Sequence, residues 1–156
     1  VVKDLNGLTA DQFLAKVSEK FEVSGGGQEA VSADAKGVFR MFLPGSGWHT
    51  IRPKAGSFDA DDVVGSLDVQ VLYDNLLHPI LGIGNPRTDE RIKYVGGIRG
   101  MAELERLTSP SAVAFDVHPV SVEEIMAIAD ASALMPPKAT WFEPKLRSGL
   151  IVRVLD

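Results

Sequence analysis

Two turn-rich segments in the second half of the chain carry the residues best suited to bind an anion. The first, residues 85–100, combines Arg87 with a glycine turn that contains Gly96, Gly97 and Arg99. Glycines let the backbone approach a ligand closely, and N–H groups at the start of a following helix point towards an anion. Arg99 could add a bidentate contact to a phosphate or carboxylate. The alternative is an ordinary tight turn with Arg99 in solvent, since the spacing of a Walker loop or a dinucleotide fingerprint is absent.

The second segment, residues 135–149, is a proline-punctuated loop in which three cations surround an aromatic pair. The cations are Lys138, Lys145 and Arg147, and the aromatic pair is Trp141 and Phe142. An aromatic pair can fasten such a loop to the core and so hold its cations in place. Glu143 in this loop and Asp89 beside Arg87 are candidates to orient a polar group of the ligand. Alternatively these charges only pair with one another, and exposed pairs contribute little, typically below about 1 kcal/mol.

Other chemistries find less support in the residue types. His49, His78 and His118 lie on separate elements without a ligand partner at metal-binding spacing, so no metal site is predicted. Asp116 and His118 would share a strand face, which would permit a carboxylate-oriented imidazole, although an ordinary structural histidine is the alternative. Ser46 and the other turn serines have no evident base, and cysteine is absent, so we predict no nucleophile and no cofactor.

Length and composition set the broad class of the protein. The chain has 156 residues, 45% of them hydrophobic, which suits a single domain over residues 1–156. A formal net charge of -5 argues against a nucleic-acid partner, because phosphate binding needs a clustered cationic face. No apolar run approaches a membrane span and cysteine is absent, so we expect a cytoplasmic protein without a membrane partner. Because the chain begins with Val1, we also expect a piece of a longer polypeptide.

The first half of the chain predicts a helix and a hairpin. The stretch from Thr9 to Gln12 has the form of a capping box, and apolar residues then recur on one face of a helix ending at Lys20. The glycines at 25–27 predict an end to regular structure and a loop up to residue 36. A hairpin follows, with strands over residues 37–43 and 48–52 around the turn at residues 44–47.

The second half alternates between predicted helices and strands. Ser66 is the predicted cap of a helix that ends near His78. Strands are then expected at 91–95, 112–117 and 150–155, and helices at 101–107 and from 121, where a second capping box begins. Such alternation favours crossover connections. We therefore predict an α+β fold with helices packed on a mixed β-sheet, in which an N-terminal helix and hairpin precede a βαβαβ-like alternation.

Several ordered stretches also carry a family resemblance. They are Val1–Gly7, Gly65–Val69, Pro79–Ile83, Pro86–Arg91, Val95–Gly100, Met135–Lys138 and Leu146–Gly149. Together they resemble the carboxy-terminal part of a bacterial and archaeal family of uncharacterised proteins, domain of unknown function ten-fifteen. In that family a preceding region has an Asp-Gly-His-His-Arg type motif, similar to free serine kinases of the ParB and sulfiredoxin-like group. The resemblance implies serine or phosphoserine chemistry whose catalytic half lies outside this sequence.

These observations lead to one functional hypothesis and one alternative. The hypothesis is that the chain adds an anion-binding surface for a small phosphorylated or carboxylated metabolite to a phosphotransferase or hydrolase. Arg99 and Arg147 would clamp the anion, while Lys138 or Lys145 would offset developing charge. The alternative is a structural or oligomerisation module that contacts the N-terminal domain or a second copy of the chain, and has no ligand site of its own.

Overall fold

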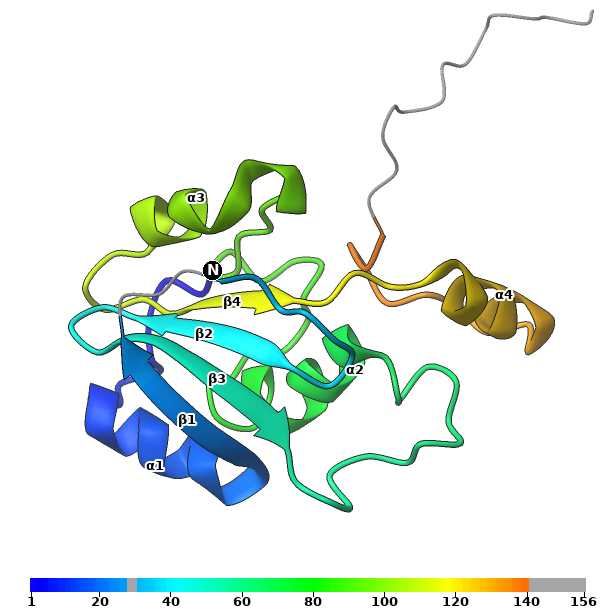
Figure 1. Ribbon diagram of the computed structural model, residues 1–156, viewed down its shortest axis with the longest axis horizontal. Coiled ribbons are helices and arrows are strands. Elements are labelled where there is room, and N and C mark those ends of the chain that lie inside the picture. Colours follow the sequence, from blue (N-terminus) through cyan, green and yellow to red (C-terminus); the bar gives the residue numbers. More distant parts are fainter. Residues whose placement is uncertain (28–30, 141–156) are drawn as a thin grey trace, which may run out of the picture.

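The computed structural model describes residues 1–27 and 31–140 (Figure 1). In these residues one antiparallel sheet has the strand order β1-β3-β2-β4. Its strands are β1 (Phe21–Gly27), β2 (Phe39–Leu43), β3 (Gly47–Pro53) and β4 (Ala114–Val117). The sheet is the frame on which the helices and the candidate site are arranged.

Helices cover both faces of this sheet. On one face lie α1 (Ala10–Lys20) and α2 (Asp68–Leu72), the latter continuing into the π-helical turn η1 (Tyr73–Leu77). On the other face lies α3 (Gly100–Leu107), which follows the 3-10 turn η2 (Gly97–Arg99). The last described helix, α4 (Val122–Asp130), extends past the end of β4 (Figure 1). The larger core is therefore on the α1 and α2 side.

The predicted helices at 9–20, 101–107 and from 121 are confirmed. Thr9 accepts a hydrogen bond from the N–H of Gln12 at 3.3 Å, and the Gln12 side chain accepts from the N–H of Thr9 at 3.0 Å. Ser121 and Glu124 form the same reciprocal box at α4. Such caps satisfy N–H groups that have no partner inside the helix, typically stabilising it by about 1 kcal/mol.

The helix predicted after Ser66 is present, but its start is different. Leu67 occupies the cap position without a side-chain hydrogen bond, so Ser66 does not cap the helix. Asp62 orders the approach instead, because its carboxylate accepts from the N–H groups of Val64 and Gly65, both at 2.9 Å. The carboxylate of Asp62, in the turn before the helix, therefore makes the kind of backbone contact that we expected from Ser66.

The predicted hairpin of β2 and β3 is confirmed, and its alternation divides the core. Phe39 is opposite Ile51 and faces the α1 side, whereas Phe42 is opposite Trp48 and faces α3. Trp48 also donates a hydrogen bond from Nε1 to Glu105 at 2.6 Å, which ties the hairpin to α3.

The glycines at 25–27 do not end regular structure, so that prediction is wrong. They continue β1 along β3, with a shift in register between Gly25 and Gly27. Gly25 and Gly26 have φ angles of +91° and +113°, which other residues rarely adopt. A Cβ at Gly25 would also approach the carbonyl oxygen of Trp48 to 3.2 Å. The glycines are required by a close, bulged strand pairing.

The α+β class is confirmed, but the partly parallel sheet is not. Every strand pairing in the described residues is antiparallel. The strand predicted at 91–95 is reduced to an isolated bridge between Ile92 and Val2, and Val2 forms a second bridge with Val113. The first residues of the chain thus lie between Ile92 and Val113. The alternation of predicted helices and strands had indicated two strands joined by a crossover connection there. The strand predicted at 150–155 lies outside the described residues.

The described helices have no membrane-spanning character. None of those between residues 1 and 140 combines the length and the apolar composition needed to cross a bilayer.

Candidate functional site

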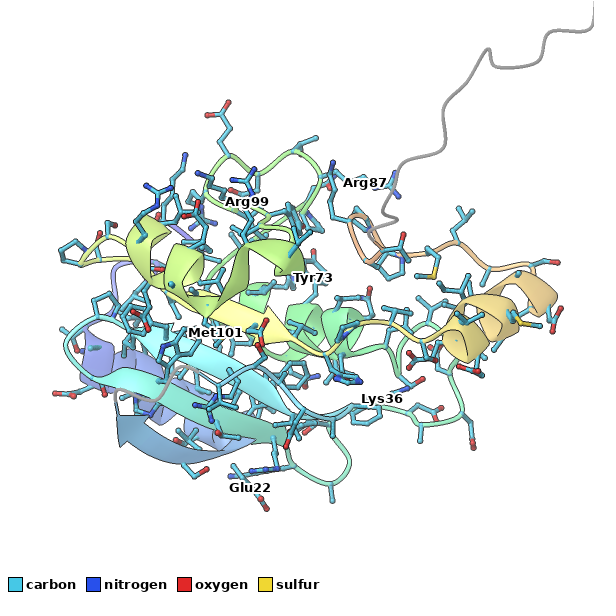
Figure 2. All side chains as sticks on the ribbon, turned by 45° about the horizontal axis from the view of Figure 1, so that its top comes forward. Glu22, Lys36, Tyr73, Arg87, Arg99 and Met101 are labelled. Carbon is cyan, nitrogen blue, oxygen red and sulfur yellow. The ribbon has the colours of Figure 1, made fainter. Side chains whose placement is uncertain are left out.

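A cavity of about 840 Å³ lies beside β4, at the opposite end of the sheet from β1. Its wall is assembled from α2 and η1, the segment from Ile92 into α3, β4 with the start of α4, and residues 136–140. Figure 2 shows Tyr73 of η1 and Met101 of α3, which both belong to this wall. Several sequence-distant parts of the described chain, among them its first two residues, Ser32 and Pro86, therefore meet around one space.

The two segments selected from the sequence meet at this cavity. Gly96 and Gly97 of the glycine turn and Lys138 of the later loop all line it. A Cβ built on Gly97 would meet no other atom within 4 Å, so the backbone there is open to a ligand. Lys138 has a φ angle of +60°, an uncommon conformation that turns the chain at this rim of the cavity.

Arg87 and Arg99 are close to the cavity in sequence but do not line it. The Arg99 side chain is 67% exposed and lies 3.8 Å from Glu103, one helical turn away. Glu103 in turn accepts two hydrogen bonds from Arg106, at 2.6 and 2.8 Å, and these bonds hold its pKa below the usual value. Figure 2 shows Arg87 and Arg99, the latter in η2, above Tyr73 in that view.

Asp89, a candidate to orient a polar group of the ligand, binds another residue of the chain instead. It accepts from the backbone N–H of Arg91 at 2.9 Å and pairs with its guanidinium at 3.3 Å. The backbone bond is the main reason that the pKa of Asp89 is lowered. The same guanidinium donates to the carbonyl oxygens of Leu81 and Gly82 at 3.0 and 2.8 Å and lies 3.4 Å from Asp4. Arg91 is thus a structural clamp.

Sequence reasoning missed one cation of the wall, Lys93. Its backbone N–H donates to the carbonyl oxygen of Val1 at 2.8 Å, which holds this stretch against the start of the chain. The nearest sequence signal was its position three residues before the glycine turn. Lys145, Arg147 and Glu143 lie outside the described residues.

Asp116 and His118 both contact the backbone of Ala33, and no hydrogen bond joins the two side chains. Asp116 accepts from the N–H of Ala33 at 2.8 Å, and Nδ1 of His118 lies 3.3 Å from the Ala33 carbonyl oxygen. Because a carbonyl only accepts, this Nδ1 carries the proton. The two side chains therefore hold the segment of residues 31–37, here called the strap, and the carboxylate-oriented imidazole considered above is not formed.

The strap has a second anchor in Asp68, which is almost completely buried. Both carboxylate oxygens of Asp68 accept from the N–H of Gly37 at 3.0 Å. Burial raises the pKa of Asp68 and also the pKa of Asp116. Lys36, which belongs to the strap, forms an ion pair with Glu124 of α4 at 2.5 Å. Asp68, Asp116 and Glu124 thus all bind the strap.

The structure places a base beside Ser46, which corrects the prediction that this turn serine has none. Its Oγ lies 2.8 Å from Nε2 of His49, three residues away across the hairpin turn. His49 is buried, its pKa is lowered by burial, and within residues 1–27 and 31–140 its Nδ1 has no hydrogen-bond partner. In the part of the chain that the structure describes, no carboxylate binds the imidazole, and neither Ser46 nor His49 lines the cavity. We interpret the contact between Ser46 and His49 as one that stabilises the hairpin turn at residues 44–47.

A metal centre is not built by the described side chains. Within residues 1–27 and 31–140, no three of the His, Asp and Glu side chains are grouped so that they could hold an ion.

Comparison with known proteins gives a family match for the first part of the chain. Residues 1–70 match the family described as "Protein of unknown function (DUF1015)". The family resemblance is therefore confirmed over the stretch from the first residue into α2. No curated protein and no solved structure matched the chain. Most of the cavity wall, including Lys93, the glycine turn and Lys138, comes after residue 70, so the match carries no information about these residues.

Proposed function

We propose that this chain is the carboxy-terminal domain of a longer protein and supplies one wall of a binding site for a small phosphorylated or carboxylated metabolite. The observation that carries the proposal is the shared cavity of the Gly96–Gly97 turn and Lys138. These positions are about forty residues apart, and both have the chemistry of anion sites: open glycine backbone and a lysine ammonium.

The charge of the described wall supports an anionic ligand. Lys93 and Lys138 are its two lysines, and Asp116 is its one acid. Asp116 already accepts the N–H of Ala33, and its pKa is raised by burial. The wall therefore presents more positive than negative charge to a ligand, and an anion between the lysines would relieve their mutual repulsion.

Further cations complete the proposed site from its rim. Arg87 follows Pro86, which lines the cavity, and Arg99 follows the glycine turn. The Arg99–Glu103 contact is long and exposed, so releasing it for a ligand would cost less than about 1 kcal/mol. Lys145 and Arg147 would approach from the loop after Lys138, and Glu143 would orient a polar group of the ligand.

The reaction, in this proposal, belongs to the longer protein. Phosphoserine, with its phosphate and carboxylate, is the ligand to test first, in line with the serine chemistry implied by the family resemblance. Phosphoryl transfer or hydrolysis would use a catalytic group from the preceding region, while Lys138 and its neighbours offset charge on the transferred group. We place this protein in the cytoplasm on its composition alone.

Calorimetric titration with phosphoserine and with inorganic phosphate tests the proposal. We expect Lys138→Ala and Lys93→Ala each to weaken phosphoserine binding about tenfold, since a hydrogen bond to a charged group contributes about 1.5–3 kcal/mol. Lys16→Ala, an exposed change on α1, is the matched control and should bind like the wild type. Absence of binding, or equal losses in all three variants, would refute the anion site.

A second function, assembly with another protein surface, is favoured by the apolar rim of the same region. The side chains of Ile98, Val122, Met126 and Leu134 are between 59% and 85% exposed, and Ile98 and Val122 belong to the cavity wall. Such a group of exposed apolar side chains is typical of an interface. The N-terminal domain of the longer protein or a second copy of the chain would cover it. Met126→Lys should then weaken association in sedimentation experiments while phosphoserine binding stays unchanged.

A further inference from the structure

Two polar residues of the cavity wall have acceptor atoms that the strap does not use. Asp116 of β4 and His118, two residues later, both line the cavity and are half-buried. Oδ2 of Asp116 accepts from the N–H of Ala33, and Nδ1 of His118 donates to the carbonyl oxygen of Ala33. Among the described residues, Oδ1 of Asp116 and Nε2 of His118 have no hydrogen-bond partner. In the neutral imidazole this Nε2 carries a lone pair, so both atoms are acceptors.

The strap fixes the positions of both acceptors. Ala33 is buried, and its two backbone groups hold Asp116 and His118 at 2.8 and 3.3 Å. Asp68 holds the end of the strap through the N–H of Gly37. A side chain that is already held by one hydrogen bond loses little further freedom when it binds a ligand. The two acceptors are therefore preorganised for recognition.

The charges around Asp116 and His118 favour a cationic donor. The two lysines of the described wall, Lys93 and Lys138, belong to other segments of it. Among the described residues that lie near Asp116 and His118, acids outnumber cations. The acids are Asp68, Asp116 and Glu124, and the cations are Lys36 and Arg40. Burial raises the pKa of Asp116, and an ammonium group beside its carboxylate would stabilise the ionised form.

We propose that Asp116 and His118 form a subsite for a protonated amine, so that the ligand of the cavity carries an amine as well as an anionic group. The amine donates to Oδ1 of Asp116 and to Nε2 of His118. The anionic group lies at the glycine turn with Lys93 and Lys138, on the other segments of the same wall. This inference rests on the proposed anion site, whose ligand class it narrows to phosphorylated amino compounds.

Calorimetric titration with a matched pair of ligands tests the proposal. Phosphoserine is compared with the phosphoglycerate that has a hydroxyl group in place of the amine and the same phosphate and carboxylate. We expect the wild type to bind phosphoserine about tenfold more tightly, because a hydrogen bond between an ammonium and a carboxylate is charge-assisted. Equal affinities would overturn this inference and leave the anion site intact. Absence of binding by both compounds would refute the anion site and this inference with it.

Substitutions at the wall locate the preference for the amine. Asp116→Asn keeps an oxygen for the N–H of Ala33 but loses the charge, so it should abolish the preference for phosphoserine. Lys93→Ala is the contrast, because it removes a contact to the anionic group. It should weaken the binding of both compounds and leave the ratio of their affinities unchanged. A ratio that survives in Asp116→Asn, or that disappears in Lys93→Ala, would contradict the subsite.

Two variants of His118 separate ligand binding from attachment of the strap. His118→Asn keeps a donor near the position of Nδ1 and has no acceptor near that of Nε2, so it should reduce the preference about threefold. His118→Gln places an amide oxygen near the position of Nε2 and has no donor near that of Nδ1, so it should retain the preference. The opposite result, with the preference kept by Asn and lost by Gln, would show that only the strap contact matters and would overturn the proposal.

Discussion

The two ends of the sheet differ in how completely their structure is satisfied. At the β1 end, α1 closes the core: Phe13 and Phe21 have no exposed surface, and β1 is paired with β3. At the β4 end, an apolar cavity lies beside the last strand of the sheet that the described residues form. The β1 end is therefore a closed hydrophobic core, whereas the β4 end has the properties of a binding surface.

Truncating the core at the closed end should have the largest effect on stability. Phe13→Ala removes a completely buried ring between α1 and the sheet, so we expect the free energy of unfolding to fall by about 3–5 kcal/mol. Leu134→Ala, at a side chain that is 85% exposed near the open end, should change it by less than about 0.5 kcal/mol. Urea denaturation measures both. Equal losses would show that the open end is packed as tightly as the closed one.

Arg91 should contribute much more to stability than its neighbour Arg87, which was the candidate from the sequence. Arg91→Lys loses the planar fork that reaches two carbonyl oxygens and Asp89, so we expect a loss of about 1–2 kcal/mol. Arg87→Lys, at an exposed side chain, should be neutral in the same thermal or urea unfolding experiment. A destabilising Arg87 variant beside a neutral Arg91 variant would contradict the assignment of the clamp.

The two capping boxes provide a matched pair across the molecule. Thr9→Ala at the closed end should lower global stability by about 1 kcal/mol, because α1 packs on the main core. Ser121→Ala should instead loosen α4 locally, because this helix extends past the sheet, and global stability should change less. Hydrogen exchange resolves the two cases. A global loss in the Ser121 variant as large as that in the Thr9 variant would place α4 in the main cooperative unit.

The pH dependence of stability provides the finest comparison. Burial raises the pKa of Asp116 in the folded chain, so its protonated form is favoured there. Its contribution is fully present below the ordinary aspartate pKa and is lost as pH rises through the raised value. Over that window the unfolding free energy of the wild type should fall relative to Asp116→Asn, which keeps an acceptor for Ala33. A difference that stays flat or rises with pH would contradict this environment for Asp116.

Local signals were sufficient for the elements whose formation depends on nearby residues. The capping boxes at Thr9 and Ser121, the turn at residues 44–47 and the apolar face of α1 all predicted structure correctly. In each case the stabilising contacts join residues within a few positions or follow one periodic face. Ser66 was the exception, because Asp62 supplied the backbone contacts that a serine cap would have made.

Features that depend on distant partners could not be predicted. The glycines of β1 form a strand because β3 approaches them closely, and Ile92 forms only a bridge because Val2 lies beside it. The same limit holds for the site. Glycine-turn chemistry identified Gly96 and Gly97 as candidates, but only the fold places Lys93 on the cavity wall and Arg99 beside Glu103.

The most direct measurement of the central claim is an NMR titration of the chain with phosphoserine, followed at backbone amides. If the cavity holds the anion between the glycine turn and the later loop, the largest shifts should occur at Gly96, Gly97 and Lys138, with Lys93 next. Amides of α1, on the far side of the sheet, serve as the internal reference and should not move. Shifts that are absent, or that are as large on α1 as at the glycine turn, would contradict the claim.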